Sequence, residues 1–96
     1  METLNLDLQM AIRIIKAQEL IIGPLAWDEA KEVAGLNVVD QKKAEVAFSG
    51  DAKDILNRLV TQYEHLFGRA SHEVCKEAVT DIVAEMKPEE IPENLK

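Results

Sequence analysis

A long helix-periodic pattern between residues 51 and 86 constrains this chain more than any other feature. Its apolar residues recur at spacings of three and four, which is typical of an amphipathic helix with one buried face. These residues are Ile55, Leu56, Leu59, Val60, Tyr63, Leu66, Phe67, Ala70, Val74, Ala78, Val79, Ile82, Val83 and Met86. Gly68 interrupts the pattern. Two outcomes are open there: the helix ends and Ser71 caps a second one, or a kinked helix continues through the glycine at a cost of about 1 kcal/mol.

Two further helices are predicted before this pattern. Residues 5–21 place apolar side chains at helical spacing, with a gap at residues 18–19 where an apolar residue is expected. A glycine-proline pair at residues 23 and 24 ends that helix, because proline lacks an N–H and restricts the residue before it. A second helix is expected over 24–34, since Gly35 suits a C-terminal cap.

Between the helices, residues 36–49 favour a short β-hairpin. Apolar residues at 36–39 and alternating residues at 44–49 flank a polar turn, which is typical of two paired strands. The turn contains no glycine, so a helix across 37–48 is the alternative. Asp51 follows directly and is predicted to be the N-cap of the helix after it.

Together these elements predict an α+β fold that is predominantly helical. It would comprise two N-terminal helices, a short hairpin, and then a long or kinked C-terminal helical pair; an all-α bundle is the alternative. Residues 1–86 are expected to form a single small globular domain. Residues 87–96 hold two prolines and three glutamates and are expected to form a flexible acidic tail, with Ile91 and Leu95 as anchors.

Composition narrows the classes of partner. The 96 residues carry a formal net charge of −7, and the longest basic run is two lysines. A nucleic-acid backbone or an anionic membrane surface would repel such a chain, so neither partner is expected. One cysteine in the whole sequence indicates a reducing, cytoplasmic setting, and neither a signal peptide nor a membrane span is apparent.

His65, His72 and Cys75 form the sharpest candidate for chemistry. These are ligand types for zinc or copper, and on a continuous helix they would fall close to one face. A small-ligand or transition-metal sensor built on them is therefore one alternative function. The opposing interpretation is that Cys75 is a small hydrophobe on the apolar face while the histidines are solvated, because no recognised ligand motif is present.

A second alternative is a helix-turn-helix DNA-binding unit over residues 27–48. Gly35 and its neighbours resemble the turn of such a motif. Lys31 stands where a small residue should let the helices approach, and Gln41 stands where the recognition helix needs an apolar anchor. The acidic net charge weighs against this alternative as well.

The leading functional hypothesis is a non-catalytic protein-interaction or regulatory module that forms a homodimer or binds another protein. The sequence has no nucleophile elbow and no glycine-rich phosphate loop, so neither an enzymatic activity nor a cofactor is indicated. The predicted hairpin would present an unpaired edge at Val46 and Phe48 for pairing with a second chain. Trp27 is either a core residue or an interface anchor.

Overall fold

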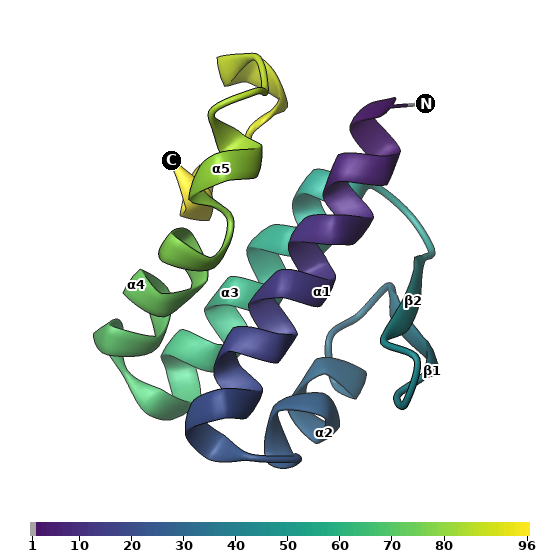
Figure 1. The fold of residues 1–96 in the computed structure, drawn as a ribbon, viewed down its shortest axis with the longest axis vertical. Coiled ribbons are helices and arrows are strands. Elements are labelled where there is room, and N and C mark those ends of the chain that lie inside the picture. Colours follow the sequence, from purple (N-terminus) through teal and green to yellow (C-terminus); the bar gives the residue numbers. More distant parts are fainter. Residues whose placement is uncertain (1) are drawn as a thin grey trace.

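The computed structural model describes the backbone of residues 2–96 and the side chains of residues 5–96. Within them the chain forms α-helices, a two-stranded antiparallel sheet and two short 3-10 turns (Figure 1). In order these are α1 Glu2–Ile22, α2 Leu25–Lys31, β1 Leu36–Asp40, β2 Glu45–Phe48, α3 Ala52–Phe67, α4 Arg69–Ala78, α5 Thr80–Val83, η1 Pro88–Glu90 and η2 Glu93–Leu95. The predominantly helical α+β prediction is confirmed, and the all-α alternative is wrong.

Helix α1 is the element around which the others gather. It contacts α2, α3, α4 and β2, and Figure 1 shows α3 behind it with α4 on one side and α2 on the other. Two side chains join it to the C-terminal helices: Gln18 donates to the carbonyl oxygen of Ser71 (3.0 Å), and Arg13 donates to Asp81 (2.7 Å). Arg13 also donates to the carbonyl oxygen of Ala78, the last residue of α4, at 3.4 Å, whereas the later residue Gln18 meets Ser71 near the start of α4. Helices α1 and α4 therefore run antiparallel.

The helix-periodic stripe of α3 faces the core as the sequence predicts, except at Leu66, which is 45% exposed in the last turn of the helix. Asp51 caps this helix, since its side chain accepts a hydrogen bond from the Asp54 amide at 3.1 Å. Leu59 and Tyr63 are fully buried, and the Tyr63 hydroxyl donates to the Ala26 carbonyl oxygen at 2.6 Å. The apolar core of the described residues consists of Met10, Ala11, Ile14, Ile15, Ala26, Trp27, Ala30, Val33, Leu36, Ile55, Leu56, Leu59, Val60, Tyr63, Cys75, Val79, Ile82, Met86 and Leu95.

At Gly68 the helix ends, which decides between the two alternatives. The glycine has φ +87°, a left-handed value that an L side chain rarely adopts, and its amide closes α3 by donating to Glu64 O at 2.8 Å. Helix α4 begins at Arg69, so the expected capping role of Ser71 is wrong. Ser71 instead lies in the first turns of α4, where it meets Gln18. The break allows α4 to fold back against both α3 and α1.

The hairpin forms without a glycine in its turn. Its register pairs Leu36 with Phe48 and Val38 with Val46. Asp40 accepts a hydrogen bond from the Lys43 amide at 3.1 Å, and Ala44 takes the positive φ (56°) that a glycine would otherwise provide. The helix alternative over 37–48 is therefore wrong. The helix-turn-helix hypothesis for residues 27–48 fails with it, because its recognition helix would occupy residues that form strands.

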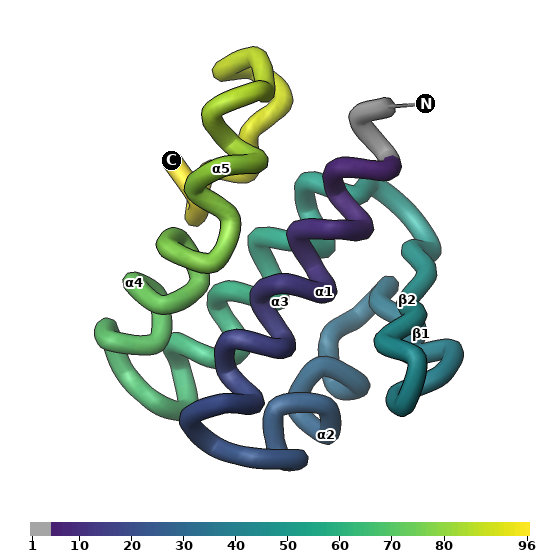
Figure 2. Tube along the Cα trace, in the orientation of Figure 1, coloured from purple at the N-terminus to yellow at the C-terminus, as the bar shows by residue number. Residues whose placement is uncertain are grey.

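The last ten residues turn back along α5 towards α4 (Figure 2). Leu95 is 3% exposed, so the predicted anchor does lie in the core, and Pro92 is fully buried beside it. Ile91 packs against the core as a partly buried side chain. The flexibility expected of this segment stays a prediction.

Candidate functional site

The cysteine of the predicted metal triad lies in the core. Cys75 is fully buried, and the Gln18 side-chain amide approaches its sulfur at 3.4 Å. Burial raises the pKa of the Cys75 thiol to about 11, with the Gln18 hydrogen bond opposing this rise. A thiol that stays protonated at neutral pH is a poor metal ligand and a poor nucleophile. Cys75 therefore behaves as a small apolar side chain.

The two histidines point to different places. The ring of His72 lies between the Asn94 carbonyl oxygen, 2.6 Å from Nε2, and the Glu64 carboxylate, 3.2 Å from Nδ1. His65 is exposed on α3. No group of three or more histidine, cysteine, aspartate or glutamate side chains in the described part of the chain is placed to hold a metal ion. The triad hypothesis fails because the helix ends at Gly68, so its members do not share one face.

The predicted interface residues are turned inward. Trp27 is 1% exposed, which supports its interpretation as a core residue and removes it as an accessible anchor. Val46 and Phe48 lie on the inner face of the hairpin and pack, partly buried, against the core. Of the residues on its outer face, Val39 is a large exposed hydrophobe at 64%. Val39 is therefore the large apolar side chain that the described hairpin exposes to solvent, and pairing of a second chain at the Val46–Phe48 edge stays a prediction.

A shallow groove of about 390 Å³ follows the seam between the end of α2 and α3. Its polar lining is largely engaged within the protein: Arg58 donates to the Ala34 carbonyl oxygen at 3.1 Å, and Gln62 donates to Glu29 at 2.7 Å. These hydrogen bonds hold α2 against α3. Because they occupy the groups that would orient a ligand, the groove is better explained as a helix–helix seam than as a binding pocket.

The exposed apolar surface gathers at one end of the molecule. Leu20 is 90% exposed and Ile21 62%, both in the last turn of α1. Leu25 at the start of α2 is 42% exposed, and Leu66 in the last turn of α3 is 45% exposed. The ends of α1 and α3 and the start of α2 all lie at the lower end of Figure 1. We call these four residues the apolar end.

The antiparallel pairing of α2 and α3 brings Leu25 and Leu66 to the same level of the two helices. Helix α2 runs antiparallel to α3, since the Arg58 side chain meets Ala34 and the Tyr63 hydroxyl meets Ala26. Tyr63 is level with Ala26, so Leu66, three residues further along α3, lies at the level of the start of α2, where Leu25 is.

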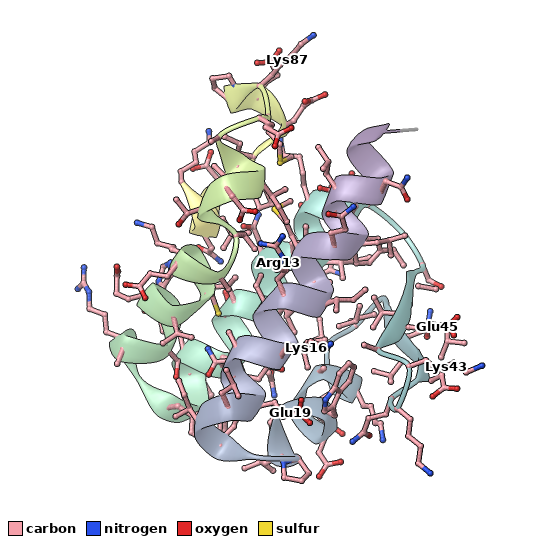
Figure 3. All side chains as sticks on the ribbon, in the orientation of Figure 1. Arg13, Lys16, Glu19, Lys43, Glu45 and Lys87 are labelled. Atoms are coloured by element: carbon pink, nitrogen blue, oxygen red, sulfur yellow. The ribbon has the colours of Figure 1, made fainter. Side chains whose placement is uncertain are left out.

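The link between α1 and α2 brings the remaining two residues to the same end. Gly23 has φ +71° and donates its amide to Glu19 O at 2.9 Å, which ends α1 in a left-handed cap. Pro24 is the N-cap of α2, so only Gly23 and Pro24 separate the two helices. Figure 3 shows Arg13, Lys16 and Glu19 descending the front of α1 towards this turn. The charged side chains of Arg13, Lys16 and Glu19 on α1 are therefore followed by the exposed apolar side chains of Leu20 and Ile21 in its last turn.

Sequence reasoning missed this surface although a signal was present. Residues 20–27 are the longest apolar stretch without a charge, and Leu20 and Ile21 fall outside the helical stripe that predicts the core. Apolar residues that cannot share the buried face of a helix are candidates for an exposed surface.

No family model, curated protein or solved structure matches this chain. Among the described residues, every helix is too short or too polar to cross a membrane.

Proposed function

We propose that this chain is a non-catalytic protein-interaction module that self-associates through its apolar end. The observation that carries the proposal is the 90% exposure of Leu20, with Ile21, Leu25 and Leu66 exposed on helix ends at the same end of the molecule. Burying apolar surface stabilises by about 25 cal/mol per Å². Four large aliphatic side chains held in water at one end of a domain therefore favour a contact that covers them.

A second copy of the chain fits this surface better than a charged partner does. Two copies that each carry a net charge of −7 repel one another over most of their surface. Contact between them requires a face whose centre carries no charge, and the apolar end is composed of leucine and isoleucine. A two-fold dimer presents the same patch on both sides, so an aliphatic patch is complementary to itself.

The expected association is weak and depends on concentration. Stable protein interfaces bury roughly 1,200–2,000 Å² in total, and four side chains on each copy provide a contact near or below the lower limit. We therefore expect a monomer–dimer equilibrium with a dissociation constant of about 10 µM to about 1 mM. This module would respond to its own local concentration.

The cellular setting that we propose is the cytoplasm. The one cysteine of the sequence is buried and protonated, so the fold needs no oxidising compartment.

Sedimentation equilibrium at protein concentrations that span the expected dissociation constant, from about 10 µM to about 1 mM, tests the proposal. The wild-type chain should gain mass with concentration, and Leu20→Lys should shift the equilibrium strongly towards monomer, since lysine preserves helix propensity while placing a charge in the patch. Val39→Lys is the matched control, because it makes the same kind of change at an exposed apolar residue of the hairpin. A wild-type chain that stays monomeric throughout, or a Leu20→Lys variant that associates as the wild type does, would refute self-association through this end.

A further inference from the structure

The C-terminal segment of residues 88–96 lies along α3. The carbonyl oxygen of Glu89 accepts a hydrogen bond from the side chain of Lys53 in the first turn of α3. Asn94 is hydrogen-bonded one turn further along the same helix, to Asn57. The segment therefore runs in the same direction as α3. Its last turn, η2, contacts α4 as well as α3, so this end of the segment lies over the line where the two helices meet.

Asn94 is held by polar groups of both helices. Its amide donates to the Asn57 side-chain oxygen at 2.9 Å, and its side-chain nitrogen donates to the Asn57 carbonyl oxygen at 2.9 Å and to the Thr61 hydroxyl at 3.1 Å. The Asn94 carbonyl oxygen lies 2.6 Å from Nε2 of His72 on α4. A side chain without an amide group cannot make the two bonds that the Asn94 nitrogen makes. We call Asn57, Thr61 and His72 the docking site, and this site selects asparagine.

Apolar side chains on both sides of Asn94 add to this selection. Pro92 is fully buried and Leu95 is 3% exposed, while Ile91 packs against the core as a partly buried side chain. The side chain of Glu93, by contrast, is 78% exposed. Burial of a side chain restricts which residue fits, and exposure does not. The contacts therefore specify an apolar residue, proline, any residue, asparagine and leucine in sequence, which we call the docking pattern.

Local chemistry gives the segment the shape in which it docks. Pro92 has φ −55°, a value that its ring imposes, and Ile91 before it is extended with φ −83° and ψ 126°. The Leu95 amide then donates to the Pro92 carbonyl oxygen at 2.9 Å, which closes one 3-10 turn. A peptide restricted in this way loses less conformational entropy when it binds. A short peptide with the docking pattern is therefore biased towards the docked shape without the rest of the fold.

We propose that the docking site recognises a segment of another protein that carries the docking pattern, and that residues 91–95 occupy the site as the chain's own competing ligand. The covalent link to α5 gives this internal ligand an effective concentration of roughly 1 mM. A second copy of the chain offers an identical segment without that advantage, so it does not displace the internal one at lower concentrations. A different protein is therefore the occupant that fits.

The exposed positions of the segment leave room for a partner to bind more tightly. Glu93 and Lys96 pair with each other at 3.2 Å instead of with α3 or α4. A partner with other residues at these two positions gains contacts that the internal ligand lacks. The apparent affinity of any partner is reduced by the fraction of chains whose site is occupied internally. The docked segment thus sets a threshold, which excludes weak ligands from the site.

A synthetic peptide of residues 87–96, titrated into the isotope-labelled wild-type chain, tests the site by NMR. The peptide and the internal ligand make the same contacts, so half of the chains should exchange one for the other at a peptide concentration of roughly 1 mM. The Asn94 amide signal of the chain should then shift towards that of an undocked segment, while amides around Asn57 should change little. An Asn94 signal unaffected by about 10 mM peptide would overturn the proposal.

Variants of the full chain measure how strongly the internal ligand competes. Asn94→Ala removes two side-chain hydrogen bonds of the internal ligand, so this chain should bind the fluorescently labelled wild-type peptide at least about tenfold more tightly than the unaltered chain does. Adding Asn57→Ala removes an acceptor from the docking site and should weaken binding about tenfold. Adding Asn37→Ala instead is the matched control, because that asparagine lies on the hairpin.

The outcomes of the variant series are distinct. Equal affinity of the unaltered and Asn94→Ala chains for the peptide, or binding that Asn57→Ala leaves unchanged, would refute recognition at the docking site. The titration of the unaltered chain does not depend on how any variant folds. Repeating it with Leu20→Lys separates the result from self-association, since the same displacement is expected when the apolar end carries a charge.

Discussion

Gln18 and Ser71, which lie 53 residues apart in the chain, are joined in the core by a hydrogen bond of 3.0 Å from the Gln18 side chain to the Ser71 carbonyl oxygen. The same nitrogen approaches the sulfur of Cys75 at 3.4 Å. Gln18 is fully buried, and its side-chain oxygen has no partner among the described residues. One polar side chain thus fixes how α1 lies along the start of α4.

Replacing Gln18 with glutamate should destabilise the fold strongly at neutral pH. The carboxylate would be buried beside Cys75 without a counter-charge, and leaving a charge unpaired in a core costs about 3–5 kcal/mol. Burial raises the pKa of such a carboxyl, so acidification should neutralise it and restore much of the loss. Urea unfolding of Gln18→Glu at about pH 7 and about pH 5 measures both effects. Gln9→Glu, on the exposed face of the same helix, should change stability by less than about 0.5 kcal/mol.

Two glycines with left-handed backbones should respond differently to alanine. A Cβ on Gly35 (φ +89°) would lie 2.9 Å from the Ile55 side chain and 2.9 Å from the Ser49 carbonyl oxygen. A Cβ on Gly23 (φ +71°) would meet nothing within 4 Å. Gly23→Ala should therefore cost about 1 kcal/mol from the backbone alone, and Gly35→Ala about 2–4 kcal/mol because crowding is added. Equal losses of unfolding free energy in the two variants would contradict the crowding at Gly35.

Stability should rise as the pH falls from 7 towards 5. The folded pKa of Asp7, about 6, lies above its ordinary value of 3.8, so the folded state binds this proton more tightly than the unfolded chain does. The resulting stability is fully present below the unfolded pKa and is lost as pH rises through the folded pKa. The difference corresponds to at most about 3 kcal/mol. In Asp7→Asn this component should vanish from the pH profile of the unfolding free energy, and a profile like that of wild type would show that Asp7 is not its source.

Cys75 should resist thiol reagents while the protein is folded. The thiol is fully buried, and its pKa of about 11 leaves little thiolate at neutral pH. Labelling by a disulfide reagent should therefore be slow in buffer, rapid in denaturant, and faster in a destabilised variant such as Gly35→Ala, since it requires opening of the fold. Prompt and complete labelling of the native wild type would show that the core around Cys75 opens more readily than its burial indicates.

Local chemistry explains what could be predicted from the sequence. The Asp51 cap, the hairpin and the buried face of α3 each depend on residues within a few positions of one another, and each is observed. Gly68 left two alternatives because a glycine permits both a kink and a turn, and the choice depends on α4 packing back against α1.

The features that could not be predicted from the sequence depend on residues that are far apart in the chain. Gln18 appeared as a gap in an apolar stripe, and its place in the core became evident only with the Ser71 carbonyl opposite it. Asn94 carried no sequence signal, since its partners Asn57 and Thr61 are more than thirty residues away. The apolar end failed to be predicted because its residues come from three helices, whose relative placement no periodicity reveals.

The antiparallel pairing of α1 with α4 has a consequence for synthesis. Helix α1 is synthesised well before α4, the helix that covers one of its sides and ends at Ala78. Until α4 has been synthesised, that side of α1 stays uncovered, with Gln18 unpaired. The nascent chain should therefore expose an apolar helix face to chaperones for as long as α4 is missing.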